Sequence, residues 1–230
     1  MPCITRLSMA LLALVGTFGC VSIPEDTPPV PVPARGPVRI ACVGDSITYG
    51  SGLANRPLES YPSVLGRLLG DTYFVSNFGV SGATMLRRGD KPYWQEERFR
   101  AVKDFNPSIV LLKLGTNDSK PQNWQYGYDF ENDYAAMVEY FRALPSRPIV
   151  VPITPVPVFD DRWGINDQAV SQVIAPSIRG VAARLGLPTI DLNAEMRNNS
   201  TMFPDGVHPN AVGADLIARK AHRVIRALRR

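Results

Sequence analysis

The chain is poor in cysteine and in histidine. Only three of its 230 residues are cysteine and two are histidine. Cys42 lies in an apolar stretch and has no obvious cysteine partner, so we expect a buried, inert thiol and a fold without disulfides. Because histidine is so scarce, any reaction that needs a histidine base must use His208 or His222.

The chain also lacks a strong excess of charge of one sign. Its formal net charge of +4 gives little reason to expect nucleic-acid binding. Six lysine and arginine residues fall within 219–230, but apolar residues recur among them at helical spacing and no aromatic residue interleaves with them. We therefore expect the solvated basic face of a terminal helix, in preference to a nucleic-acid or membrane patch.

The apolar run near the N-terminus is too short to span a bilayer. It reads "LSMALLALVGTFG" (7–19), follows Arg6 and ends at Cys20, which predicts a signal peptide over 1–19. The small residue before Cys20 resembles the lipobox of bacterial lipoproteins and makes Cys20 a lipidation candidate. Thr17 and Phe18 depart from that pattern, so secretion with cleavage elsewhere stays open.

A proline-rich segment follows the predicted signal peptide. The stretch "SIPEDTPPVPVPARGP" (22–37) cannot continue a helix or a central strand, and we expect 20–37 to be an extended tether. The remaining residues, 38–230, are of a length that suits one domain. This organisation predicts an exported protein, tethered in the cell envelope (periplasmic or on the outer surface) or secreted, whose only membrane contact would be a lipid at Cys20.

Apolar runs of strand length alternate with helical patterns along the predicted domain. Strands are expected over 38–44, 72–79, 108–115, 148–155 and 188–192, and helices over 60–69, 130–144, 168–185 and 210–229. Strands that are apolar on both faces and separated by helices predict a parallel sheet covered on both sides. We therefore expect a single doubly wound α/β domain with five strands, and a ligand crevice beyond the carboxyl ends of those strands.

Ser46 follows the first predicted strand and is a candidate nucleophile. A nucleophilic serine needs a base, and the base needs a group that orients it. His222 lies among cations that would disfavour its protonation, so it fits a surface or packing role. His208 lies in the loop "MFPDGVHPNAVG", three residues after Asp205, and a turn could bring that carboxylate onto the imidazole. An exposed loop histidine with a capping aspartate fits this segment equally well.

Acyl transfer also needs donors directed at the developing oxyanion. The backbone N–H groups of Ser46 and Gly82 are candidates, and the side-chain amide of Asn117 could supply a third donor. Taken separately, these segments are also consistent with an ordinary turn and an ordinary helix cap. We expect Asp118 to accept structural hydrogen bonds within this loop and not to act as a second base.

Four segments together resemble the SGNH (GDSL-type) hydrolase family. They are "GDSIT" (44–48), "NFGVSGAT" (77–84), "GTND" (115–118) and "DGVH" (205–208), in the order of the family's blocks, and the resemblance covers 38–229. It implies a flavodoxin-like three-layer α/β/α fold and no metal or organic cofactor. It implies Ser46 as nucleophile, His208 as base and Asp205 as orienting group, with an oxyanion hole formed by Ser46, Gly82 and Asn117.

The substrate suggested by these residues is an ester carried on a carbohydrate. The loops after the strands carry aromatic residues that could stack on sugar rings or could simply pack on the core: Tyr93, Trp94, Trp124, Tyr126, Phe159 and Trp163. Family members of this size often resemble carbohydrate O-acetylesterases. We expect Trp94, Trp124, Trp163 and Asp45 to contact a small or glycan ester, and the small polar residues nearby favour a short acyl group.

Two other functions fit the same residues. One is a lysophospholipase or thioesterase, which would prefer acyl groups longer than acetate. The other is an envelope glycan O-acetyltransferase or a glycan-binding protein, which would retain glycan binding without hydrolysis.

Overall fold

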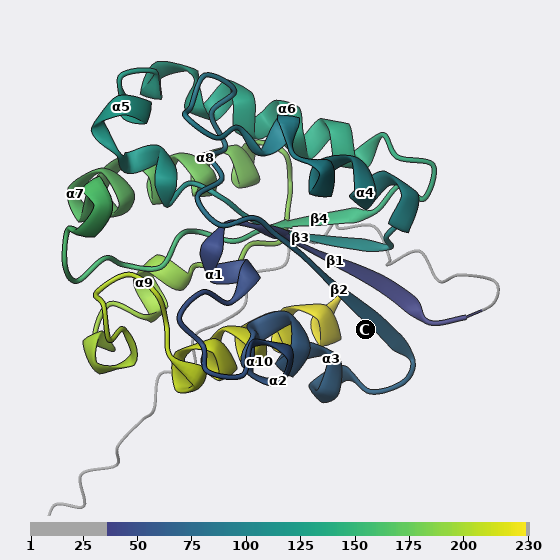
Figure 1. The fold of residues 1–230 in the computed structure, drawn as a ribbon. Coiled ribbons are helices and arrows are strands. Elements are labelled where there is room, and N and C mark those ends of the chain that lie inside the picture. The colour runs from purple at the N-terminus through teal and green to yellow at the C-terminus, as the bar shows by residue number, and fades with distance from the viewer. Residues whose placement is uncertain (1–35, 229–230) are drawn as a thin grey trace, which may run out of the picture.

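The computed structural model describes residues 36–228 as a three-layer α/β/α domain (Figure 1). The predicted signal peptide (1–19), Cys20 and the tether up to residue 35 lie outside the described residues. Within 36–228, no helix is long and apolar enough to cross a membrane.

The central layer is a parallel sheet with the strand order β2-β1-β3-β4. Its strands are β1 (Val38–Gly44), β2 (Tyr73–Gly79), β3 (Ile109–Lys113) and β4 (Ile149–Pro152). The register pairs Gly44 with Gly79 on one side and with Lys113 on the other, so β1, β2 and β3 end at one level. The chain runs outward from β1 in both directions, as expected of a doubly wound sheet.

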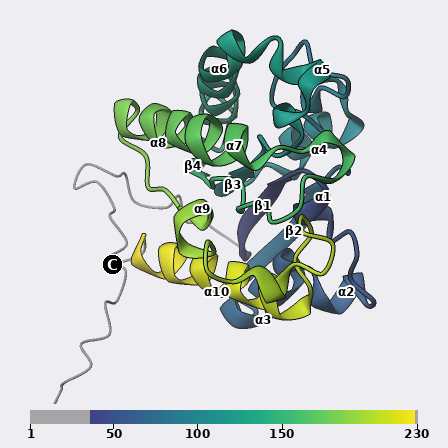
Figure 2. The same ribbon diagram turned by 90° about the vertical axis from the view of Figure 1, so that its left-hand side faces the viewer.

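Alternation along the strands divides the core into two halves. In β1, Ile40 and Cys42 belong to one cluster of buried residues, whereas Ala41 and Val43 belong to the other. The first cluster includes α3 (Tyr61–Leu69) and α10 (Ala211–Ala227). The second includes α4 (Glu97–Phe105), α6 (Phe130–Arg142) and α8 (Ala175–Arg184). Figure 2 shows these two groups of helices on opposite faces of the sheet.

Shorter helices complete the loops. They are α1 (Ser46–Tyr49), α2 (Arg56–Glu59), α5 (Pro121–Trp124), α7 (Asp167–Ala169) and α9 (Leu192–Glu195). A π-helical stretch over Val170–Ile174 joins α7 to α8, so the helix expected over 168–185 has three parts. The helix α4 was not anticipated, because its nine residues, ERFRAVKDF, are mostly charged and bury only Phe99 and Val102.

The prediction of a fifth strand over 188–192 is wrong, although the three-layer parallel fold is confirmed. This segment makes a single parallel bridge, between Ile190 and Ile153, next to β4. Two backbone hydrogen bonds support the bridge, from the Ile190 N–H to Pro152 and from the Thr154 N–H to Ile190. Pairing does not extend before the bridge, because Pro152 and Pro188 have no N–H to donate. It does not extend after the bridge, because Asp191 caps α9, which begins at Leu192.

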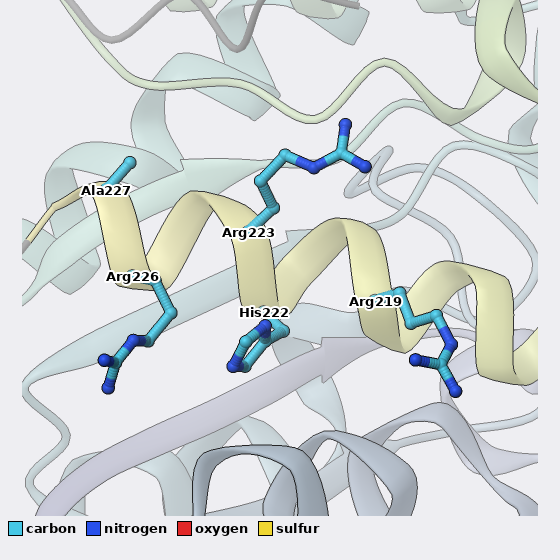
Figure 3. A pocket seen from close by; sticks show the side chains of 5 residues that line it. All are labelled: Arg219, His222, Arg223, Arg226 and Ala227. Atoms are coloured by element: carbon cyan, nitrogen blue, oxygen red, sulfur yellow. The ribbon is translucent and has the colours of Figure 1, made fainter. Parts of the chain in front are cut away.

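The terminal helix has the expected amphipathic form. Ile217, Ala221, Val224 and Ile225 are buried against the sheet. On the other side, Arg219, His222, Arg223 and Arg226 surround a surface hollow (Figure 3). All residues that line this hollow belong to α10, so it is separate from the loops at the carboxyl ends of the strands. Burial, together with the charges of Arg226 and Arg219, lowers the pKa of His222, as the sequence had suggested.

Candidate active site

The first strand delivers Ser46 to the carboxyl edge of the sheet. β1 ends at Gly44, Asp45 caps the short helix α1 by accepting from the Ile47 N–H at 3.0 Å, and Ser46 is the first helical residue. Ser46 keeps only 7% of its surface exposed. A serine at the start of a helix directly after a buried strand has a backbone N–H that the helix itself does not use.

A continuous chain of hydrogen bonds links Ser46 to a histidine and a carboxylate. His208 Nε2 lies 2.9 Å from Ser46 Oγ, although 162 positions separate the two residues in the sequence. On the other side of the ring, His208 Nδ1 lies 2.8 Å from Asp205 Oδ2. A carboxylate on Nδ1 favours the tautomer in which Nδ1 carries the proton and Nε2 is free to accept one.

The turn that carries Asp205 and His208 is held by its own backbone. Asp205 Oδ1 accepts from the N–H groups of Val207 and His208, at 2.9 and 2.7 Å. Gly206, between them, has a φ of 80° and lies against Asp160, where a Cβ would come within 2.4 Å of the Asp160 Cβ. Glycine is therefore required at this position.

Hydrogen bonding keeps the Asp205 carboxylate ionised. Partial burial raises the pKa of Asp205, but hydrogen bonds from the His208 N–H, the His208 ring and the Val207 N–H outweigh it and hold the pKa below its ordinary value. The turn thus provides a fixed negative charge beside the imidazole, where it stabilises an imidazolium ion.

The two further residues predicted as oxyanion donors lie on neighbouring loops. Gly82 has a φ of 82°, a left-handed conformation that suits glycine, and follows β2. Asn117 begins the 3-10 turn Asn117–Ser119 after β3, and its amide donates to the Ala83 carbonyl at 3.1 Å. An amide nitrogen has two N–H groups, so this bond fixes the Asn117 side chain and leaves one donor.

Asp118 is a structural acceptor, in agreement with the sequence-based expectation. Its carboxylate is fully buried and accepts from the backbone N–H groups of Met85 and Leu86, at 3.0 and 2.7 Å. Burial raises its pKa to about 7, while the bonds from Leu86 and Met85 act in the opposite direction. These contacts hold the loop after Gly82 against the loop of Asn117.

The aromatic residues expected to contact substrate occupy different positions. Trp163 is 58% exposed, and the centroid of its ring lies 5.3 Å from that of His208. Trp94 instead packs on Phe99 and donates to the Met85 carbonyl. Trp124 packs on Phe130. Of the three tryptophans, Trp163 is the one that these contacts bring beside His208.

The backbone of Trp163 is in an unusual conformation. Its φ of 55° is left-handed, which is rare for a large side chain and costs about 1–3 kcal/mol. Contacts on both sides hold this loop: the Phe159 N–H donates to Gly206 beside His208, and the Asn166 N–H donates to Ser119 beside Asn117. Trp163 therefore lies on a loop that joins the histidine turn to the Asn117 turn.

Asp45 and Lys113 form a buried ion pair that the sequence reasoning missed. Both side chains are fully buried, and Lys113 Nζ lies 3.2 Å from both oxygens of Asp45. Asp45 was expected to contact substrate, but its carboxylate faces Lys113 and the Ile47 N–H instead. The available signal was a single lysine at the end of an otherwise apolar strand.

The structure gives no support to catalysis by a thiol or to a metal site in its described residues. Cys42 is a free, fully buried thiol whose pKa burial raises, in agreement with the inert role expected for it. In the described part of the chain, no group of three or more histidine, cysteine, aspartate or glutamate side chains is arranged to hold a metal ion.

Ser46, His208 and Asp205 thus form one hydrogen-bonded chain at the carboxyl edge of a three-layer α/β/α fold, an arrangement that serine hydrolases also use. The chain belongs to the GDSL-like lipase/acylhydrolase family, whose model matches residues 42–216. The matched residues include all four segments that resemble the SGNH (GDSL-type) hydrolases. The predicted family, a family of carboxylic ester hydrolases, is therefore confirmed.

Among known proteins, the chain is 41% identical over 207 residues to an acetylxylan esterase of Xylanibacter ruminicola. The match covers 82% of this chain and 43% of that relative, so the chain spans less than half of the relative's length.

Solved structures share the fold. A carbohydrate acetylesterase from Sinorhizobium meliloti aligns with a TM-score of 0.70 at 20% identity, covering 83% of this chain and 99% of the other. The aryl esterase of M. smegmatis aligns with a TM-score of 0.68 at 19% identity, with the same coverage. A two-domain esterase active on acetylated mannans aligns with a TM-score of 0.59 at 21% identity, over 84% of this chain and 49% of that one.

Proposed function

We propose that the chain is a serine esterase that removes short acyl groups, acetyl above all, from carbohydrate through an acyl-enzyme. The observation that carries the proposal is the hydrogen-bonded chain from Ser46 Oγ through His208 to Asp205, at 2.9 and 2.8 Å. Similarity to an acetylxylan esterase supports the choice of an acetylated glycan as substrate.

The proposed reaction has two steps. His208 Nε2 removes the proton of Ser46 Oγ as that oxygen attacks the ester carbonyl, and the imidazolium then protonates the leaving sugar oxygen. His208 next deprotonates a water molecule that attacks the carbonyl of the acyl-enzyme. The imidazolium then returns this proton to Ser46 Oγ as the bond between the acyl carbon and Oγ breaks, which releases the carboxylic acid and free Ser46. Asp205 stays ionised throughout and stabilises the imidazolium.

The developing oxyanion needs donors that are already in place. We assign this role to the N–H groups of Ser46 and Gly82 and to the free N–H of the Asn117 amide. Each such donor contributes on the order of 3 kcal/mol in the transition state. The bond from Asn117 to the Ala83 carbonyl supports this assignment, because it restrains the amide next to Gly82.

A series of esters and acetylated glycans tests the function. With parent protein, we expect the highest kcat/KM on acetyl esters, a decline as the acyl chain lengthens, and acetate release from acetylated xylan. Rates that rise with chain length would favour a lysophospholipase or thioesterase. Glycan binding without acetate release would contradict the esterase and favour a glycan-binding protein.

Trp163 is the residue best situated to contact the sugar. Its ring is exposed beside His208, and stacking of a pyranose on it would bring the acetyl group toward Ser46. We expect Trp163→Ala to raise KM for an acetylated xylo-oligosaccharide about 10-fold, equivalent to roughly 1.4 kcal/mol. The same change should alter KM for a small acetate ester by less than about 2-fold.

Two further variants control this measurement. Trp163→Phe keeps a ring and should retain most of the glycan affinity. Phe74→Ala removes another exposed aromatic side chain, on β2, and should leave both KM values at the parental level. Equal losses on the glycan and the small ester would show that Trp163 only supports His208.

A further inference from the structure

Lys113 is a charged residue at the end of a strand whose other residues are all apolar. Its side chain is fully buried. The ammonium group lies 3.2 Å from each carboxylate oxygen of Asp45 and 3.2 Å from Thr116 Oγ1. It therefore has three oxygen partners, on two different segments of the chain.

Stability alone gives a weak reason for this arrangement. Removing two charges from water costs several kcal/mol per ion, and an apolar pair of similar volume often serves as well. Burial lowers the pKa of Lys113, whereas the charge of Asp45 raises it. The desolvation of Asp45 and Lys113 costs free energy, and the pair lies next to the proposed nucleophile Ser46. We therefore consider whether the pair fixes the positions of groups in the active site.

The partners of Lys113 directly precede two of the proposed oxyanion donors. Asp45 precedes Ser46, and its carboxylate also accepts from the Ile47 N–H, so its position sets the orientation of the peptide that carries the Ser46 N–H. Thr116 precedes Asn117, whose amide is the proposed side-chain donor. Lys113 and Gly44 are paired in register across β1 and β3, so the ammonium lies between the ends of two adjacent strands.

We propose that Lys113 is a positioning residue that sets the separation between the Ser46 N–H and the Asn117 amide. It holds the first through Asp45 and the second through Thr116, and it touches neither substrate nor the reacting atoms. This inference rests on the proposed function, because it assumes that both groups bind the oxyanion.

The decisive variant replaces both charges together. Lys113→Met alone would leave a buried, unpaired carboxylate and could prevent folding. The double variant Asp45→Asn with Lys113→Met removes one charge of each sign, and the new asparagine can still cap α1. We expect it to fold with a Tm close to the parental value, to lose about 100-fold in kcat, and to change KM by less than about 2-fold.

Thr116→Val tests the second connection with the ion pair intact. Valine has nearly the same shape as threonine but cannot accept from the ammonium, so we expect kcat to fall about 10-fold with KM unchanged. Tyr134→Phe is the matched control: it removes a fully buried hydroxyl that donates to the Leu112 carbonyl of the same strand. This control should lower the Tm slightly and leave kcat at the parental level.

A second readout uses phosphonylation of the serine by a small activated phosphonate ester. The transition state of this reaction needs the same donors, so its rate in the folded double variant should fall by a factor similar to that for kcat. A folded double variant with parental kcat and parental phosphonylation would overturn the proposal. A parental kcat in Thr116→Val would also contradict it, because the connection to Asn117 would then have no effect.

Measurements on the parent protein distinguish a failure of the proposed esterase function from a failure of the role proposed for Lys113. If the esterase function fails, the parent protein itself would neither hydrolyse acetate esters nor carry the phosphonate on Ser46 when examined by peptide mass spectrometry. A parent that does both, together with a fully active double variant, refutes only the positioning role of Lys113.

Discussion

Replacing Ser46 by alanine is expected to lower kcat for a small activated acetate ester by about 10⁴-fold or more. Alanine removes the oxygen that attacks the carbonyl, and no acyl-enzyme can form. The protein should keep its fold, because Ser46 Oγ makes its hydrogen bond to His208 at the edge of the sheet and contributes nothing to the apolar core. Initial rates of ester hydrolysis, with circular dichroism of the same samples, measure both effects.

A variant of a neighbouring serine provides the control. Ser51 is close in sequence, and its hydroxyl shares a 2.9 Å hydrogen bond with Ser81. Ser51→Ala should keep kcat within about 3-fold of the parental value, since it has no part in the proposed chemistry. If the Ser46 variant retained parental activity, Ser46 would not be the nucleophile and the proposed mechanism would fail.

Replacing Asp205 by asparagine should produce the second largest loss, on the order of 10³–10⁴-fold in kcat. Asparagine is nearly the same size but neutral, so it neither fixes the Nδ1–H tautomer nor stabilises the imidazolium. It can still accept from the N–H groups of Val207 and His208 through its side-chain oxygen, so the turn should persist. Burst kinetics with an activated ester would show slow acylation at a normal concentration of active sites.

The matched control for this substitution is Asp215→Asn. Asp215 pairs with Arg219 on the exposed side of α10, where an ion pair contributes little to stability. We expect this variant to resemble the parent in both kcat and Tm. An Asp205 variant as active as the Asp215 variant would mean that another group orients His208.

These expectations depend on how the fold collects short segments at one edge. Parallel strands end at the same side of the sheet, so the loops after β1, β2 and β3 meet there. The turn that carries Asp205 and His208 precedes α10, which packs with α3 under β1. Ser46, Gly82, Asn117 and His208 therefore come from four separate parts of the chain, and hydrogen bonds within and between these loops hold them.

The strands and most of the candidate site residues could be predicted from patterns within short stretches of the sequence. The buried positions of β1 and, apart from Lys113, of β3 are apolar or glycine, so the existence of these strands follows from composition over five to seven residues. The Asp205–His208 pair was visible because a carboxylate three residues before a histidine can reach it through one turn. Ser46, Gly82 and Asn117 were predicted because each follows directly after a predicted strand and matches a short family segment.

Contacts between distant segments explain what the residue order could not predict. The prediction of a fifth strand was wrong because Asp191 caps a helix and the facing residues Pro152 and Pro188 lack donors, and which residues face each other depends on how the segments meet in space. The three tryptophans look alike in the sequence, yet Trp94 and Trp124 pack on neighbouring rings while a left-handed turn exposes Trp163 beside His208. Asp45 is next to the serine, but only the pairing of β1 with β3 brings Lys113 against it. Apolar periodicity reports whether a position is buried, whereas the partner of a buried side chain is decided by tertiary packing.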